Sequence, residues 1–231
     1  MVAAHLFVAD LDNPEIDPRD RHHVERVLRL RAGEAISVSD GLGGVRPCVL
    51  AREGDLDPTG AVEREARPSP LLTVGFALVK GDRPEWIVQK LTECGIDRIV
   101  PFVAARSVVR WDESKAERNL ERFRTVAREA AMQSRRTWLP EVCPVLPFAG
   151  LAGVLGGGFA LADGRGDAPT LDHPAVLVGP EGGWTDAELA FADALVRLGS
   201  HVYRAETAAI AAGVTLAQLR QGLVKPGKSD P

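Results

Sequence analysis

The chain has 231 residues, enough for one large domain or two smaller ones. It is 45% hydrophobic and 26% charged, the ordinary composition of a soluble globular protein, and it has neither an apolar run of membrane-spanning length nor a secretory signal pattern. Its three cysteines are scattered without a C-x-x-C spacing. This composition argues against a membrane protein, a disulfide scaffold and a zinc site, so we expect a cytoplasmic protein with no bound metal.

The net charge of −4 is unevenly spread along the chain. Residues 80–140 carry 13 Lys or Arg against 9 Asp or Glu, whereas the parts before and after are acidic. A basic middle in an acidic protein fits contact with a polyanion. A solvated helix face explains the same charges, so charge alone leaves both interpretations open.

The first part of the chain is expected to form a small β-barrel. Alternating runs predict short strands at residues 5–8, 35–39, 45–51 and 60–64, with glycine-rich turns between some of them. Residues 20–30 (DRHHVERVLRL) predict a helix, because four apolar side chains recur on roughly one side. The segment RPSP at residues 67–70 is the best candidate for a linker.

From Leu71 onwards strands and helices alternate, which predicts a mostly parallel α/β sheet. The predicted strands are residues 71–79, 98–102, 159–162, 175–178 and 201–204. The predicted helices run from Pro84 to Gly95, from Ser114 to about Arg136, and over residues 186–198 and 207–223. Ser114 with Glu117 forms a capping-box pattern at the start of the second of these helices.

The stretch around which the rest of the chain is organised follows the apolar run 175–178. It reads GPEGG at residues 179–183, and Thr185 with Glu188 then forms a capping box that predicts a helix start. Strand, glycine turn and helix are typical of a nucleotide-type site, although an ordinary strand-to-helix turn has the same glycines. The spacing matches neither a P-loop nor a dinucleotide fingerprint. Because Glu181 would repel a phosphate, the contacting part of the ligand is expected to be neutral or cationic.

Six stretches covering much of the chain resemble one family. They are HHVERVLRLRAGE at 22–34, KGDRPEWIVQKLTECGIDRIVPF at 80–102, ARSVVRW at 105–111, REAAMQSRRTWLPEV at 128–142, VGPEGGWTDAEL at 178–189 and LGSHVYRAETAAIAAG at 198–213. In this combination the chain resembles the SPOUT-class methyltransferases, and within them the small-subunit ribosomal RNA uridine-N3 methyltransferases of the RsmE family. Met132, Cys94 and Tyr203 depart from the residues usual in that family.

The resemblance implies an N-terminal PUA-like β-barrel over residues 1–68. It implies a C-terminal α/β methyltransferase domain with a trefoil knot over residues 71–231. The implied activity is S-adenosylmethionine-dependent methylation of N3 of a specific uridine in 16S ribosomal RNA, on the assembled small ribosomal subunit. The implied assembly is a homodimer, to which the final helix would offer Ile210, Val214, Leu216 and Leu219 unless these only pack the core.

The resemblance places the cofactor among three loops. The residues that it implies are Leu161, Ala162, Gly179, Pro180, Glu181, Gly182, Gly183, Leu198, Gly199, Val202, Tyr203, Arg204, Ala205, Thr207 and Ala208. S-adenosylmethionine is a sulfonium cation with a carboxylate and no phosphate. This chemistry agrees with a glutamate inside the glycine turn.

Arg204 and Glu206 are the candidate catalytic residues. They lie two apart in a segment expected to be extended, so their side chains would share one face. Uracil N3 needs a proton acceptor, or a cation that stabilises the uracil anion, before it can attack a methyl group. We assign Arg204 to the charge on the carbonyl oxygens, and Glu206 to orienting the donor or accepting the proton. A structural ion pair between the two is the alternative.

A group of basic residues is expected to contact the RNA. They are His22, His23, Arg26, Arg29, Arg31, Lys80, Arg83, Arg106, Arg135 and Arg136. Two rival functions stay in view: a different SPOUT-class RNA methyltransferase, for example one acting on the ribose 2′-oxygen, and a non-catalytic RNA-binding or assembly factor.

Overall fold

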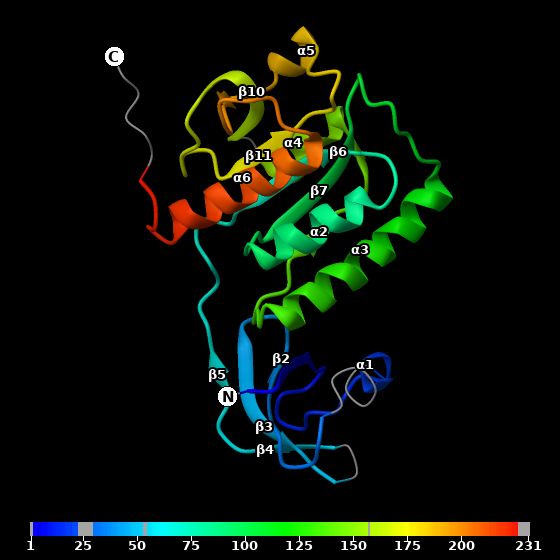
Figure 1. Ribbon diagram of the computed structural model, residues 1–231, viewed down its shortest axis with the longest axis vertical. Helices are drawn as coiled ribbons and strands as arrows, with labels where there is room; N and C mark the ends of the chain where they lie inside the picture. The colour runs from blue at the N-terminus through cyan, green and yellow to red at the C-terminus, as the bar shows by residue number, and fades with distance from the viewer. Residues whose placement is uncertain (1, 23–29, 53–54, 157, 226–231) are drawn as a thin grey trace. The chain divides into compact units, whose positions relative to one another are not determined.

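The computed structural model describes residues 2–22, 30–52, 55–156 and 158–225 (Figure 1). The chain forms two compact units. Residues 1–68 and 128–139 make the first unit, and residues 69–127 and 140–231 make the second. One boundary falls in the RPSP segment, and another falls inside helix α3 (Glu113–Gln133).

The first unit is built on a five-stranded sheet. Its strands are β1 (Ala4–Phe7), β2 (Ala35–Ser39), β3 (Gly44–Leu50), β4 (Leu56–Pro58) and β5 (Glu63–Arg64). They pair in the order β1-β2-β3-β4 with β5 beside β3, and all pairs except β1 with β2 are antiparallel. Alternate residues such as Ile36 and Val38 point into one apolar core. Helix α1 (Pro18–His22) covers the start of the helix predicted over residues 20–30, and residues 23–29 lie outside the described part of the chain.

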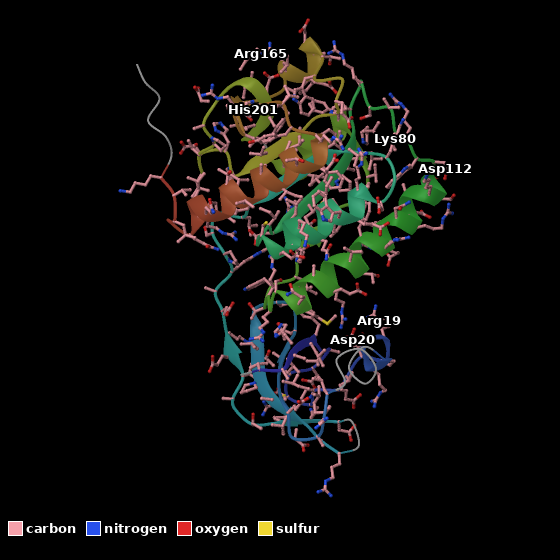
Figure 2. The ribbon with its side chains drawn as sticks, in the orientation of Figure 1. Arg19, Asp20, Lys80, Asp112, Arg165 and His201 are labelled. Atoms are coloured by element: carbon pink, nitrogen blue, oxygen red, sulfur yellow. The ribbon has the colours of Figure 1, made fainter. Side chains whose placement is uncertain are left out.

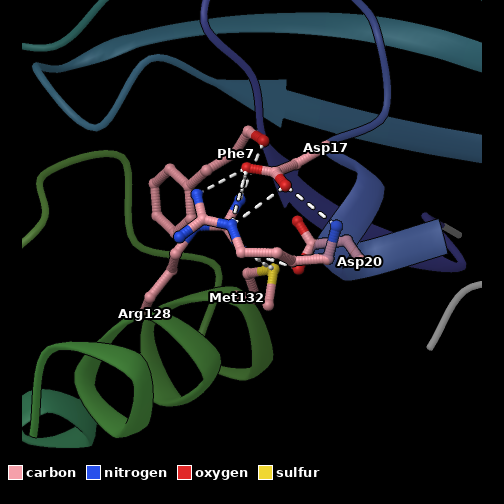
Figure 3. Close-up of polar contacts among 6 residues, drawn as sticks. Phe7, Asp17, Asp20, Arg128 and Met132 are labelled. Carbon is pink, nitrogen blue, oxygen red and sulfur yellow. Dashed lines mark hydrogen bonds and ion pairs between the residues drawn. The ribbon is translucent and has the colours of Figure 1, made fainter. Parts of the chain in front are cut away.

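Residues 128–139 pack with this sheet, although the sequence pattern assigned them to the second domain. The guanidinium of Arg128 donates to Asp20 Oδ1 at 2.7 Å and to the Phe7 carbonyl at 3.1 Å, and it lies over the Phe7 ring (Figure 3). Met132, one turn later, packs against the apolar core. Met132, which departs from the residue usual in the family that the chain resembles, therefore has a structural reason.

The chain leaves α3 through an arginine in the left-handed backbone region. Arg135 has φ +56°, and the N–H of Arg136 donates to the Ala131 carbonyl at 2.9 Å, the pattern of a Schellman end at which glycine is usual. The Arg135 guanidinium donates to the Val2 carbonyl at 2.8 Å. A ring nitrogen of His5 lies 3.0 Å from the Arg136 carbonyl oxygen. Two long-range contacts within the first unit therefore hold this turn.

The second unit contains a parallel sheet of seven strands. They are β6 (Thr73–Ala77), β7 (Arg98–Val103), β8 (Glu141–Val142), β9 (Leu146–Pro147), β10 (Phe159–Asp167), β11 (Ala175–Val178) and β12 (Ala194–Val196). The order is β12-β10-β11-β6-β7-β8 with β9 also beside β7, and every pairing is parallel. The predicted parallel α/β sheet is confirmed. The trefoil knot stays a prediction, because strand order does not describe how the chain threads.

Helices cover both faces of this sheet (Figure 1). Helices α2 (Arg83–Glu93) and α6 (Ala205–Arg220) and the first part of α3 pack on the face to which Val74 and Phe76 point. The 3-10 helix Phe148–Gly150 and α4 (Leu151–Leu155) pack on the other face, to which Ala77 points. No helix in the described ranges is both long and apolar enough to span a bilayer.

The helix predicted over residues 186–198 is wrong. Helix α5 covers only Asp186–Leu189, and strand β12 then pairs with β10. The strand predicted over residues 201–204 is wrong as well, because this segment joins no sheet within the described residues and Arg204 is the N-cap of α6. An apolar run that suits a helix also suits a strand, and only the neighbouring strand decides between them.

The capping box predicted at Ser114 and Glu117 is also wrong. Helix α3 begins at Glu113, and Asp112 Oδ1 accepts hydrogen bonds from the Lys115 N–H at 2.8 Å and from Ser114 Oγ at 2.9 Å. An aspartate immediately before the helix therefore caps its first turn.

Candidate cofactor and substrate site

The three predicted cofactor segments meet around the carboxyl end of β11. Strands β10 and β11 are parallel neighbours in which Leu161 pairs with Leu177, so both strands run towards the same edge of the sheet. The start of α6 joins them, because Ala205 and Ala208 pack in the core that contains Val178. Leu161 and Ala205 are 44 positions apart in the sequence. The sheet and the helix packed on it bring the three segments side by side.

The first segment differs from its prediction. A loop was expected after Leu161 and Ala162, but β10 continues to Asp167 with an irregular register between Ala162 and Asp167. Leu161 is fully buried and Ala162 is half-buried. Gly166 allows the continuation, because a Cβ there would overlap the backbone of β12.

The glycine turn uses its glycines in different ways. Gly183 has φ +69°, and its N–H donates to the Pro180 carbonyl at 2.8 Å. Gly179 and Gly182 do not adopt positive φ. A Cβ on Gly179 would lie 2.8 Å from the Trp184 ring, and a Cβ on Gly182 would lie 3.2 Å from the Cβ of Arg106. Close packing within the protein therefore explains these two glycines.

Trp184 and Glu188 connect the turn to its neighbours. The indole N–H of Trp184 donates to the Ala162 carbonyl at 3.0 Å, which ties β10 to the turn. The capping box predicted for Thr185 and Glu188 is confirmed. The same Glu188 carboxylate accepts the Ala105 N–H at 2.8 Å, which ties the segment after β7 to the helix start. Neither residue is among the site residues predicted from the sequence, although a tryptophan beside a glycine turn and a capping glutamate are both recognisable in the sequence.

The predicted RNA contact Arg106 faces the glycine turn. One guanidinium nitrogen donates to the Gly182 carbonyl at 3.1 Å. The side chain is exposed at the surface of the second unit. Arg106 therefore contacts one of the predicted cofactor segments within the second unit.

The third segment precedes and opens α6. Leu198 and Gly199 are half-buried, whereas Val202 is fully exposed and Tyr203 is 38% exposed. A Cβ on Gly199 would overlap the Tyr203 hydroxyl, so the segment folds closely on itself. His201 lies in the same loop (Figure 2).

Arg204 and Glu206 are not placed as predicted. Arg204 is an exposed N-cap residue, while Glu206 lies in the first turn of α6, so the two do not share one extended face. Among the described residues no ion pair joins them. Glu206 is only 7% exposed, and its Oε1 lies 3.7 Å from Nε of Arg83. Its Oε2 is buried without a hydrogen-bond partner in the described structure. The carboxylate therefore has an open acceptor atom at the start of a helix, where negative charge is favourable.

The remaining predicted RNA contacts are divided between the two units. His23, Arg26 and Arg29 lie outside the described residues, and His22 belongs to α1. Arg31 and Arg135 are exposed in the first unit. Lys80 is exposed between β6 and α2 in the second unit (Figure 2).

Comparison with known proteins identifies the family. Residues 67–217 match the model of an RNA methyltransferase domain, and residues 16–57 match that of an RNA methyltransferase PUA domain. The chain is 34% identical to ribosomal RNA small subunit methyltransferase E of Mycobacterium bovis, with 92% of this chain and 90% of the relative covered. It is 33% identical to the Bacillus subtilis protein of the same name, with 81% and 82% covered.

Solved structures agree with this result. The protein of the same name from Neisseria gonorrhoeae, bound to S-adenosyl methionine, has a TM-score of 0.78 at 25% identity, covering 94% of this chain and 97% of that one. A methyltransferase from Legionella pneumophila in complex with the same cofactor has a TM-score of 0.77 at 25% identity, covering 92% and 96%. The chain belongs to the ribosomal RNA small subunit methyltransferase E (RsmE) family.

Proposed function

We propose that the chain transfers a methyl group from S-adenosylmethionine to N3 of a specific uridine in 16S ribosomal RNA, on the assembled small ribosomal subunit in the cytoplasm. The observation that carries this proposal is the buried Glu206 carboxylate, whose Oε2 has no partner within the described residues. It lies at the start of α6, one residue after Ala205, which packs in the same core as the carboxyl end of β11. Family membership supplies the substrate class.

The residues around the glycine turn fit S-adenosylmethionine. Glu181 is exposed in the turn and repels a phosphate, but it tolerates a sulfonium cation. Gly183 has a positive φ. Gly182 is exposed, and it has no side chain that could block the approach of a ligand to the backbone. We assign the holding of the cofactor to the turn, to Leu161 and Ala162, and to the segment Leu198–Ala208. When bound, S-adenosylmethionine supplies an electrophilic methyl group.

The proposed chemistry at the nucleobase needs a proton acceptor. Uracil N3 carries a proton, and its lone pair becomes a good nucleophile only as that proton leaves. Glu206 Oε2 takes this proton in our proposal, because it is an acceptor that no group of the described chain occupies. Arg204, exposed at the N-cap of the same helix, stabilises the negative charge that spreads onto the flanking carbonyl oxygens.

We also propose that the active form is a homodimer. Val202 is fully exposed next to the proposed site, and Val214 of α6 is 36% exposed. Leu216 and Leu219, which were predicted as possible dimer contacts, are buried in the second unit instead. Exposed apolar side chains beside the site support a partner surface there. Light scattering at micromolar concentration tests this point, and a monomer mass contradicts it.

The decisive experiment compares two substrates. The purified protein and S-adenosylmethionine are incubated with small subunits from a strain that lacks the endogenous enzyme, and in parallel with naked 16S RNA. Nucleoside mass spectrometry should then find 3-methyluridine on the subunits. A ribose-methylated nucleoside would place the chain with a different SPOUT-class activity. Cofactor binding without any methylated product, or no cofactor binding in calorimetry, would contradict the proposal in favour of a non-catalytic role.

A further inference from the structure

We propose that Arg83 is a positioning residue of the reaction. It holds Oε1 of Glu206 so that Oε2 stays directed at the nucleobase proton. This inference rests on the proposed function, because it needs Glu206 to be the proton acceptor. It also reassigns Arg83, which is among the RNA contacts predicted from the sequence.

The fold fixes the two residues relative to each other. Arg83 is the first residue of α2 and Glu206 lies in the first turn of α6, and these helices pack against each other in the second unit (Figure 1). Gly213 permits this packing, because a Cβ there would lie 2.6 Å from Cδ2 of Leu91. Two rigid helices in direct contact therefore determine where the guanidinium meets the carboxylate.

The contact itself is asymmetric. Nε of Arg83 lies 3.7 Å from Glu206 Oε1, beyond the usual hydrogen-bond distance but within the range of an ion pair. The Glu206 side chain is 9% exposed, whereas that of Arg83 is 42% exposed. The second carboxylate oxygen is buried with no partner in the described residues. One oxygen thus lies in ion-pair range of Arg83, while the other has no hydrogen-bond partner among the described residues.

A buried, half-unsatisfied carboxylate is costly unless something uses it. Arg204 lies two positions before Glu206 in the sequence, but no ion pair or hydrogen bond among the described residues links it to the carboxylate. Arg83 is therefore the cation in ion-pair range of Glu206 within the described chain. Since arginine stays charged at any working pH, Arg83 attracts Oε1 for as long as the carboxylate is ionised, that is, until Oε2 takes the proton.

The test is single-turnover methylation at saturating small subunits and cofactor. Arg83→Ala should lower the rate about a hundredfold, since a misplaced catalytic group costs on that order. Affinities for cofactor and subunit should stay within about twofold, because Arg83 acts on Glu206 and not on the ligands. Arg83→Lys keeps the charge without the planar fork and should restore part of the rate. Arg83→Gln keeps the length without the charge and should behave like the alanine variant.

A double-mutant cycle separates positioning from an independent role. Adding Arg83→Ala to Glu206→Gln should lower the rate no further than Glu206→Gln alone. Arg122→Ala is the matched control and should leave the rate unchanged. Arg122 lies on α3 and pairs at 2.7 Å with Glu85, which lies on α2 as Arg83 does. Circular dichroism confirms that each variant is folded.

Three results would overturn the inference. A weaker subunit affinity with an unchanged saturated rate would return Arg83 to the RNA contacts. If the rate losses of the two single variants multiply in the double variant, Arg83 acts independently of Glu206. A full rate in both Arg83→Ala and Arg83→Gln would remove its role. Failure of the proposed function is distinct, because the wild-type chain itself would then make no 3-methyluridine.

Discussion

Replacing Glu188 should release two backbone N–H groups and one hydroxyl at the helix start beside the glycine turn. This carboxylate is 5% exposed, and it accepts the Ala105 N–H at 2.8 Å, the Thr185 N–H at 2.9 Å and the Thr185 hydroxyl at 3.0 Å. The Thr185 hydroxyl in turn accepts the N–H of Glu188. Glu188→Ala removes the acceptor for both segments at once, so we expect a loss of both stability and cofactor affinity.

The magnitude follows from these contacts. A hydrogen bond to a charged group contributes about 1.5–3 kcal/mol, and loss of a helix cap costs about 1 kcal/mol. The freed Ala105 and Thr185 groups lie where water can reach them, which recovers part of this energy. We therefore expect Glu188→Ala to lower the free energy of unfolding by about 3 kcal/mol. Glu188→Gln replaces one oxygen by an NH₂ group that cannot accept, so it should cost about half as much.

Urea unfolding followed by circular dichroism gives the stability change, and amide hydrogen exchange at Ala105 reports the broken contact directly. Asp186→Ala is the control, because Asp186 is an exposed acid in the same first turn and should cost about 0.5 kcal/mol through the helix dipole alone. If Glu188→Ala changes stability by less than about 1 kcal/mol and leaves exchange at Ala105 unchanged, the connecting role of this carboxylate is refuted.

Three further outcomes are expected. Gly182→Val should weaken S-adenosylmethionine binding at least about tenfold in calorimetry, because the new Cβ would lie 3.2 Å from that of Arg106 and shift the turn; unchanged affinity would misplace the site. Burial lowers the pKa of His5, so the unfolded chain binds a proton more readily than the folded chain. The free energy of unfolding should therefore fall as the pH drops below about 6.5, and His5→Gln should flatten that dependence in urea titrations. Burial raises the pKa of Cys143 to about 11, so iodoacetamide at pH 8 should label it only after unfolding, and stability should fall as pH rises from 9 towards 11; peptide mass spectrometry and melts at increasing pH test both points.

Local chemistry alone determined much of the fold. Strand Ala35–Ser39, strand Ala175–Val178 and the capping box of Thr185 and Glu188 appear where the sequence predicted them. Each depends on neighbours within a few residues: alternating side chains, a short apolar run, or a hydroxyl and a carboxylate three positions apart. The parallel sheet followed from the alternation of strands and helices, because parallel strands need crossover connections.

Contacts between distant residues decided the rest. Residues 186–198 were predicted as one helix, but β10 offers backbone partners to Ala194–Val196 that no local pattern displays. Glu206 was paired with its near neighbour Arg204, yet the packing of α2 on α6 brings it Arg83, which lies 123 positions earlier in the chain. A side chain's spacing in sequence fixes its face only once the local backbone is known, and here a helix replaced the expected extended segment. The acceptor proposed for catalysis could be named from the sequence, but its ion-pair partner and its open oxygen are products of helix packing.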